Sequence, residues 1–360
     1  MMNIIMITVD GLRRDHVSRI KSLSSFASKS RFYSGIITAA PYTIASMHAV
    51  FSGTYPTRNG VNSYYNMFRF KKDRFKTLTQ YLKAAGYYCS ADVINDSILP
   101  KDGFDSFSIH DENKDDLAKR HEALLESLKG KFFLYLHYSN IHTRLINDVQ
   151  KRYTDMAPEF FGASEENRKR YDGYMAGCNR YLEKILGKIS KLGYDKNSII
   201  VVLSDHGVSL GEKPGERMYG CFVFDYTLKT FCVLSIPGQE HVENDYQASS
   251  VDIMPTILKL LKIMHDDNFE KPDGEPLLSL DKDRLVFSET GGLGGPWPSH
   301  KEHNVFCARL PKAKAIYYKT PAKWEFYDLA ADPDEMKPAD KPRNETERLL
   351  TQQLKKKYRF

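Results

Sequence analysis

The sequence of 360 residues contains no uninterrupted apolar run of about 18 residues, the length that a membrane-spanning helix needs. Its N-terminus also lacks the charged segment and the small-residue cleavage site of a secretory signal. The apolar stretch at residues 4–9 leads directly into Asp10 instead. We therefore predict no membrane span and interpret residues 4–9 as the first strand of the core.

Cysteine is scarce, and none of the five cysteines lies in the C-x-x-C spacing of a metal site. An odd number of isolated thiols is typical of a reducing compartment, which predicts a cytoplasmic location. Lysine and arginine total 52 against 46 acidic residues, and they are scattered rather than gathered in a basic stripe with interleaved aromatics. This distribution argues against nucleic-acid binding and is compatible with an anionic substrate.

What the sequence does contain is an alternation of apolar runs and amphipathic segments. The apolar runs predict strands at residues 4–9, 87–92, 132–138, 198–203 and 231–235. The amphipathic segments predict helices at residues 16–30, 75–85, 117–128, 168–192 and 251–261. Strands that alternate with helices predict an α/β fold, a three-layer sandwich with a mostly parallel central sheet.

The composition changes near residue 265. Residues 266–283 are polar and contain proline, and short strand-like pieces follow. These pieces lie at residues 284–288, 305–309 and 315–319, before a charged end with a predicted terminal helix within residues 337–360. We predict an α/β domain over residues 1–265 and a small C-terminal antiparallel α+β subdomain over residues 266–360 that completes the fold.

Two of the predicted strands end in acidic residues. Asp10 follows residues 4–9, and Asp205 with His206 follows residues 198–203. Ligands of open α/β sheets bind beyond the carboxyl ends of the strands, so these side chains are expected at one edge. Carboxylate oxygen suits hard divalent cations, and zinc and manganese also accept histidine nitrogen. The sequence therefore predicts one divalent metal site, with zinc or manganese preferred and calcium possible.

Thr43 stands at the start of a predicted helix between these two motifs. A cation held by Asp10, Asp205 and His206 would also bind the Thr43 hydroxyl and lower its pKa, which makes it a nucleophile. The free N–H groups of the helix start would attract a tetrahedral anion such as phosphate or sulfate. The alternative is that Thr43 is only an N-cap, a position that threonine favours.

Four further residues are candidates around this centre. His137 and His142 follow the apolar run 132–136; His142 is our candidate general acid for the leaving group, because the ordinary pKa of histidine suits that role. His137 is expected to bind substrate. Arg58, a few residues beyond the Thr43 helix, could contact the anion, and His48 on that helix is either a packing residue or a substrate contact.

These segments resemble the sulfatase family within the alkaline phosphatase superfamily, nearly from end to end. The resemblance is carried by Ile7–Gly11, Thr43–Pro56, Phe133–His142, Ser204–Glu212, Val251–Thr256 and Phe326–Leu329 with Asp332–Pro333. It implies an alkaline phosphatase-like fold and an ester hydrolase with metal ligands at Asp10, Thr43, Asp205 and His206. The implied substrate is an anionic phosphate- or sulfate-ester small molecule or glycan.

The sequence also departs from that family. Sulfatases proper carry cysteine or serine in a C/S-x-P-x-R motif that yields formylglycine, whereas Thr43 is followed by Ile44–Met47 without the proline or the arginine. A threonine nucleophile resembles the phosphoryl-handling relatives, such as nucleotide phosphodiesterases. We predict a phosphate or phosphonate (di)ester hydrolase. The alternatives are a sulfatase without formylglycine and a soluble phospho-substituent transferase acting on a glycan. A second metal, with His300 and His303 as ligands, is left open.

Overall fold

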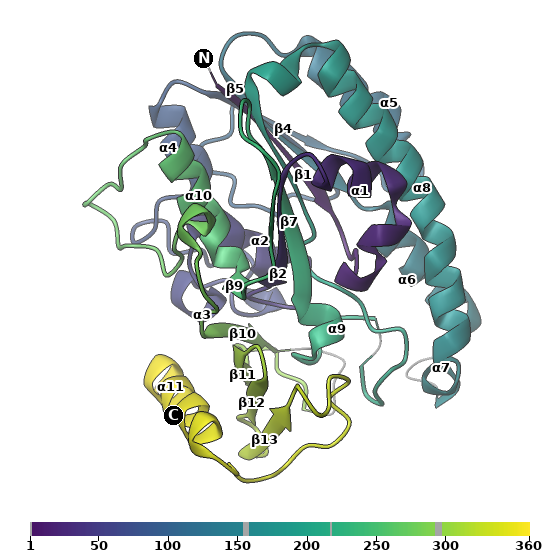
Figure 1. The fold of residues 1–360 in the computed structure, drawn as a ribbon, viewed down its shortest axis with the longest axis vertical. Coiled ribbons are helices and arrows are strands. Elements are labelled where there is room, and N and C mark those ends of the chain that lie inside the picture. Colours follow the sequence, from purple (N-terminus) through teal and green to yellow (C-terminus); the bar gives the residue numbers. More distant parts are fainter. Residues whose placement is uncertain (1, 154–157, 217, 292–296) are drawn as a thin grey trace.

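The computed structural model describes residues 2–153, 158–216, 218–291 and 297–360 (Figure 1). Its main sheet has the strand order β4-β3-β5-β1-β6-β7-β2-β8, and β9 pairs with β2. The strands of this sheet are β1 (Asn3–Val9), β2 (Arg31–Ile37), β3 (Tyr88–Val93), β4 (Ser106–Ile109), β5 (Phe132–Tyr138), β6 (Ser198–Leu203), β7 (Lys229–Ser235), β8 (Val242–Asn244) and β9 (Ala248–Ser249).

Helices follow most of these strands. The α-helices are α1 (Lys21–Ala27), α2 (Thr43–Ser52), α3 (Pro56–Asn59), α4 (Leu78–Ala84), α5 (Leu117–Ser127), α6 (Asn140–Arg152), α7 (Pro158–Gly162), α8 (Ser164–Lys191), α9 (Asp225–Leu228), α10 (Ile253–Leu260) and α11 (Glu345–Tyr358). Short 3₁₀ helices are η1 (Arg14–Arg19), η2 (Tyr64–Asn66), η3 (Tyr194–Lys196), η4 (Ser250–Asp252) and η5 (Leu277–Ser279).

The sheet is mostly parallel, as predicted. β1 pairs in parallel with β5 and β6, and β3 pairs in parallel with β4 and β5. The exception is β7, which runs antiparallel to both β6 and β2. The carboxyl ends of β1, β3, β4, β5 and β6 therefore lie at the same edge, which is where the candidate site forms.

Helices cover both faces of the sheet, and side chains of β1 alternate between the two resulting cores (Figure 1). Ile4 and Met6 pack in the core that contains residues of α2, α4 and α10. Ile5 and Ile7 pack in the core that contains residues of α1, α5 and α8. A strand buried on both faces explains why residues 4–9 read as a continuous apolar run, and the three layers confirm the predicted architecture.

A second, four-stranded antiparallel sheet forms near the C-terminus, with the order β10 (Val286–Thr290), β11 (Val305–Leu310), β12 (Ala313–Tyr318) and β13 (Lys323–Asp328). Leu350 and Leu354 of α11 cover one face of this sheet. The other face contributes Ile316 and Cys307 to a core shared with Phe222 and Phe224. The antiparallel sheet is as predicted, and the domain boundary at residue 265 stays a prediction.

Several elements differ from the sequence prediction. The single helix predicted over residues 16–30 is wrong, because Ile20 adopts an extended conformation that separates η1 from α1. β2 was not predicted; its sequence interrupts the apolar pattern with Ser34 and Gly35. β13 was also not predicted, although its central residues Glu325 and Tyr327 are buried. β2 obtains its partners β7 and β8 from distant parts of the chain, whereas β13 forms a hairpin with β12, the strand directly before it.

A buried network of charges joins the C-terminal sheet to the main domain. Asp225 of α9 binds Arg309 of β11 at 2.7 Å and Lys314 of β12 at 3.0 Å, and Lys314 also binds Glu335 at 2.7 Å. Burial alone would raise the pKa of Asp225, but Lys314 and Arg309 outweigh it and hold that pKa well below its usual range. Asp225 is therefore ionised and fully paired.

The replacement Asp225→Ala should lower the free energy of unfolding by about 3–5 kcal/mol, because the buried Arg309 loses its carboxylate and the buried Lys314 keeps only Glu335. The paired carboxylate stabilises the fold above the ordinary aspartate pKa, and this contribution is lost as the pH falls through the lowered folded pKa. The difference between the proteins should therefore shrink on acidification. Urea unfolding at several pH values measures it, with exposed Asp340→Ala as the control. A loss below about 1 kcal/mol at neutral pH would contradict the argument.

Candidate active site

The carboxyl ends of β1 and β6 bring Asp10, Asp205 and His206 together, as their sequence positions predict. All three side chains are buried, and one ligand atom from each lies within 4.8 Å of the others. His206 Nε2 is 3.5 Å from Asp10 Oδ1 and 3.5 Å from Asp205 Oδ2. The turn after Asp10 helps to hold the group, because the backbone N–H of Gly11 donates to Asp205 Oδ1 at 3.2 Å.

Thr43 is the first residue of α2 and turns its hydroxyl toward this group. Thr43 Oγ1 lies 3.4 Å from Asp10 Oδ1 and 3.2 Å from His206 Nε2. The N-cap of α2 is Tyr42, whose side chain makes no capping hydrogen bond. Thr43 is therefore not the N-cap, and the capping alternative does not explain its position. Every residue of α2 is buried, so packing on all sides fixes the helix that carries this hydroxyl.

The polar atoms of the group are turned toward its centre. His206 Nδ1 lies 2.8 Å from the carbonyl oxygen of Gly207, which can only accept, so Nδ1 carries a proton and Nε2 keeps its lone pair in the neutral ring. Asp205 Oδ2 is buried and has no hydrogen-bond partner among the described residues. A free imidazole nitrogen beside two buried carboxylates is the donor set of a divalent cation, so the residues present fit such an ion.

The two carboxylates have opposite pKa shifts. Burial raises the pKa of a carboxyl group, but in Asp10 the neighbouring His142 and His137 outweigh it and lower the pKa. In Asp205, burial and the negative charge of Asp10 both act in the same direction and raise the pKa. The pair thus places two mutually repelling acids in a dry environment, where a neighbouring positive charge would stabilise their ionised forms.

His137 and His142 both reach this group. His137 lies within β5, and its Nε2 is 3.1 Å from Asp10 Oδ2, so it contacts the carboxylate rather than open space. His142 lies in the first turn of α6, and its Nδ1 is 4.0 Å from the same oxygen. Both ring nitrogens of His142 are without a hydrogen-bond partner in the described part of the chain, and its ring packs on Tyr219. The ring nitrogens of His142 are therefore not committed to another group of the described chain.

The structure does not bring Arg58 or His48 to the Thr43 group. The guanidinium of Arg58 binds Asp273 at 2.9 Å and Glu270 at 3.1 Å and lies over a phenylalanine ring. His48 is buried, its Nδ1 donates to the Ile44 carbonyl oxygen at 2.8 Å, and burial lowers its pKa to about 4. Both side chains are thus engaged elsewhere, and a substrate contact for either one stays a prediction without support from the geometry.

The C-terminal part of the chain contributes contacts to the start of α2 that the sequence did not reveal. Tyr42, immediately before Thr43, places its hydroxyl 2.7 Å from His303 Nε2, and His303 Nδ1 lies 3.1 Å from Glu289 of β10. Both nitrogens of His303 are therefore occupied, which argues against the idea that it binds a second metal. No pattern within residues 286–304 signals this contact, because it depends on how two distant segments pack.

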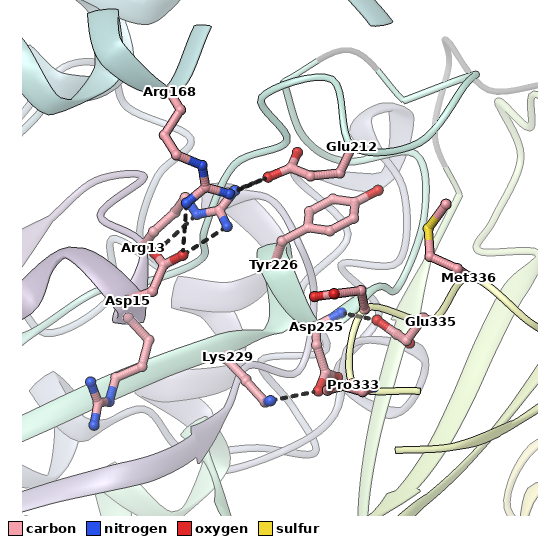
Figure 2. A pocket seen from close by; sticks show the side chains of 12 residues that line it. Arg13, Asp15, Arg168, Glu212, Asp225, Tyr226, Lys229, Pro333, Glu335 and Met336 are labelled. Carbon is pink, nitrogen blue, oxygen red and sulfur yellow. Dashed lines mark hydrogen bonds and ion pairs between the residues drawn. The ribbon is translucent and has the colours of Figure 1, made fainter. Parts of the chain in front are cut away.

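Residues 13–15, which follow Asp10 closely in the sequence, line a cleft of about 730 Å³ (Figure 2). Arg13 anchors its inner wall: Nη1 donates to the Val208 carbonyl oxygen at 3.0 Å, and the guanidinium pairs with Asp15 and Glu212. Figure 2 shows Arg168 pairing with the same two acids. Arg13 and Arg168 are already paired with carboxylates, so they are not available to bind an anionic ligand. Their contacts instead connect the turn after Asp10 to the loop after His206.

A second cluster of side chains of the types that bind metals lies at the same edge of the sheet. Asp92, His110 and His121 are buried and hold one ligand atom each within 4.8 Å of one another. None of these three residues was predicted from the sequence to belong to a site. The only sequence signal is that Asp92 and His110 come at or just after the ends of strands, as Asp10 does.

The family model described as Sulfatase matches residues 2–263 of the chain. The chain belongs to the sulfatase family. Its alignment with an "Ulvan-active sulfatase" of Formosa agariphila shows 24% identity over 191 residues, which is 50% of this chain and 36% of that relative. This sulfatase-family chain thus matches only about a third of the length of that curated relative.

Solved structures share the fold over almost the whole chain. A structure described as a 2-O GAG sulfatase has a TM-score of 0.79 at 18% identity and covers 99% of this chain and 91% of its own. The phosphonate monoester hydrolase of Silicibacter pomeroyi has a TM-score of 0.76 at 15% identity and covers 100% of this chain and 96% of its own. The alkaline phosphatase-like fold expected from the sequence is therefore confirmed. Among the described helices, none is both long and apolar enough to cross a membrane.

Proposed function

We propose that this chain is a metal-dependent ester hydrolase that cleaves phosphate or phosphonate esters, diesters above all, with Thr43 as the nucleophile. The observation that carries the proposal is the Thr43 hydroxyl, which caps no helix and lies 3.2 Å from His206 Nε2 and 3.4 Å from Asp10. Family membership leaves both phosphorus and sulfur esters open. The threonine favours phosphorus, because an alcohol nucleophile needs no conversion to formylglycine.

Asp10, Asp205 and His206, with the Thr43 hydroxyl, are the residues that would hold the cation. The unpartnered Asp205 Oδ2 and the free lone pair of His206 support this assignment. Zinc or manganese is preferred over calcium, because one of the donors is an imidazole nitrogen. A divalent cation at this position supplies positive charge that stabilises both an ionised hydroxyl and the oxygens of the transferring group.

The chain's own residues then perform two displacements. Thr43 Oγ1, having lost its proton to solvent, attacks phosphorus; the Oγ1–P bond forms and the bond to the leaving alcohol breaks. His142 donates a proton to the departing oxygen, for which its two unpartnered nitrogens are suited. Water then attacks phosphorus and gives a proton to His142, and the Oγ1–P bond breaks. The free N–H groups of the first turn of α2 help to hold the anion throughout.

The proposed substrate is an anionic ester of a small molecule or a glycan. The proposed compartment is the cytoplasm, and the buried thiols support it: burial raises the pKa of Cys89 and Cys232 to about 12, which leaves them unreactive. Such thiols are compatible with a reducing environment.

A sulfatase without formylglycine is the second candidate, and the sulfatases among the similar proteins support it. One matched relative is named an ulvan-active sulfatase, and one structural neighbour is described as a GAG sulfatase. The two candidates differ in which bond Thr43 attacks, and they predict opposite orders of reactivity toward matched esters.

The test is a comparison of kcat/KM on bis-p-nitrophenyl phosphate, a p-nitrophenyl phenylphosphonate and p-nitrophenyl sulfate, each with manganese, zinc or calcium. We expect the diester or the phosphonate to be cleaved faster than the sulfate by about tenfold or more, a difference of about 1.4 kcal/mol in the barrier. Acid quenching during turnover should leave a phospho-adduct on the peptide that contains Thr43. Faster release of sulfate would establish the second candidate instead. Turnover only after an acceptor glycan is added would indicate a transferase.

A further inference from the structure

Asp92, His110 and His121 come from three neighbouring elements at the edge of the sheet beside β5. Asp92 is the penultimate residue of β3, His110 directly follows β4, and His121 lies on α5. Their side chains are almost completely buried. The ring of His137 separates them from the Thr43 group, with its centroid 6.4 Å from that of His110. The proposed ester hydrolysis uses none of the three, so their gathering needs its own explanation.

The inward-facing atoms of the three residues converge. His121 Nε2 lies 3.5 Å from Asp92 Oδ1, and His110 Nδ1 contacts the same oxygen. His121 Nε2 is buried and has no hydrogen-bond partner among the described residues. A buried polar nitrogen without a partner costs free energy, so its presence points to a ligand that the three residues share.

The outward-facing atoms are all held by other groups. His121 Nδ1 lies 2.7 Å from the hydroxyl of Tyr181, and His110 Nε2 lies 3.4 Å from Ser139 Oγ. Asp92 Oδ2 accepts from Nε of Arg120. Histidines that bind metals usually donate their other ring N–H to an oxygen acceptor, and carboxylate ligands are likewise hydrogen-bonded from outside. The cluster has this arrangement at each of its three members.

We propose that Asp92, His110 and His121 form a second cation site that takes zinc. Two imidazole nitrogens and one carboxylate oxygen are donors that zinc accepts, whereas calcium and magnesium require oxygen. Ligand atoms of a tetrahedral zinc, with bonds of about 2.0–2.2 Å, lie about 3.3 Å apart. The separation of 3.5 Å between His121 Nε2 and Asp92 Oδ1 is close to this value.

The local charge permits a cation. Arg120 faces Asp92, but its Nη1 also lies 3.8 Å from Asp115 Oδ2, so one guanidinium is shared between two carboxylates. Asp92, Asp115 and Arg120 together therefore carry one net negative charge. A zinc ion here would tie the segment between β4 and α5 to β3. Through His110 it would also fix Ser139, the residue before the helix that carries His142. The site is separate from Thr43 and does not depend on which ester is cleaved.

The test is the number of zinc ions that the full chain retains. Chelator-treated protein is reloaded with zinc, freed of excess ions and analysed by mass spectrometry, with the melting temperature recorded in parallel. Wild type should retain two ions per chain, and His121→Gln should retain one. Asp205→Asn should also retain one, because it removes a ligand from the other group. His265→Gln is the matched control: this half-buried histidine bonds to Tyr81 outside both clusters and should leave both ions bound.

Two outcomes would overturn the second site. One is a wild type that retains a single zinc ion which Asp205→Asn removes, and this result would leave the Thr43 centre intact. The other is a His121→Gln protein that retains as many ions as wild type. If His121→Gln does not give the circular dichroism spectrum of the folded protein, His110→Gln, directly after β4, serves as the second variant, with the same expected loss of one ion. If wild type retains one zinc ion that His121→Gln removes and Asp205→Asn does not, the second site stands and the result counts against the proposed function.

Discussion

Replacement of Thr43 by alanine should lower kcat on the preferred ester by at least about 1,000-fold, because the reaction loses its nucleophile rather than a binding contact. The melting temperature should change little. The Thr43 hydroxyl caps no helix, and its neighbours Asp10 and His206 keep their other partners. A variant that folds normally and loses turnover separates chemistry from stability. Stopped-flow or endpoint release of p-nitrophenol measures the first, and thermal unfolding measures the second.

Thr43→Ser gives the sharper comparison, since it restores a hydroxyl at the same atom and removes only a methyl group. We expect it to recover activity well above that of Thr43→Ala and to form the same covalent adduct. Thr351→Ala is the matched control, because this threonine lies on α11 and donates to a helix carbonyl oxygen far from the site. If Thr43→Ala keeps more than a tenth of the wild-type kcat, Thr43 is not the nucleophile.

The residues whose positions were predicted correctly share one property. They lie at the carboxyl ends of parallel strands or at the start of the helix between them in the sequence. Parallel pairing of β1 with β6 fixes the direction of both strands, so Asp10 and Asp205 had to meet at one edge. The apolar runs of both strands are long and continuous, which makes their ends visible in the sequence. Thr43 followed from the same reasoning, as the first residue of α2.

His48 and Arg58 are close to Thr43 in the sequence, but this proximity did not predict their contacts. His48 is five residues beyond Thr43, a rotation of about 140° around the helix axis, so its side chain leaves the opposite face. Arg58 is near in sequence, but it pairs with Asp273, more than 200 residues away along the chain. The Asp92 cluster was missed for a related reason: β4 has only four residues and alternates serine with apolar residues, so its end was not recognised.

Replacement of Asp205 by asparagine should abolish metal binding at the Thr43 group while stabilising the metal-free protein. Asp205 Oδ1 accepts from the Gly11 N–H, and asparagine can keep that hydrogen bond. The amide nitrogen then replaces Oδ2, which has no partner among the described residues and lies 3.5 Å from the lone pair of His206 Nε2. In the variant, the carboxylate that repels Asp10 is replaced by an amide N–H that can donate to His206 Nε2.

In chelator-treated protein we expect Asp205→Asn to raise the free energy of unfolding by about 1–3 kcal/mol, because one of two buried like charges disappears. With zinc or manganese present, the order should reverse: wild type gains stability from binding, and the variant gains less. Turnover should fall by at least about 100-fold, since the cation proposed to activate Thr43 would lose one of its ligands. Chemical unfolding with and without the metal measures both orders, and exposed Asp340→Asn is the control. A chelated variant less stable than wild type would show that Asp205 is held by the fold and not by a cation. A site built for a cation should destabilise the protein when the cation is absent, because Asp10 and Asp205 then repel each other. A reversal of the two stabilities on adding metal would detect this cost.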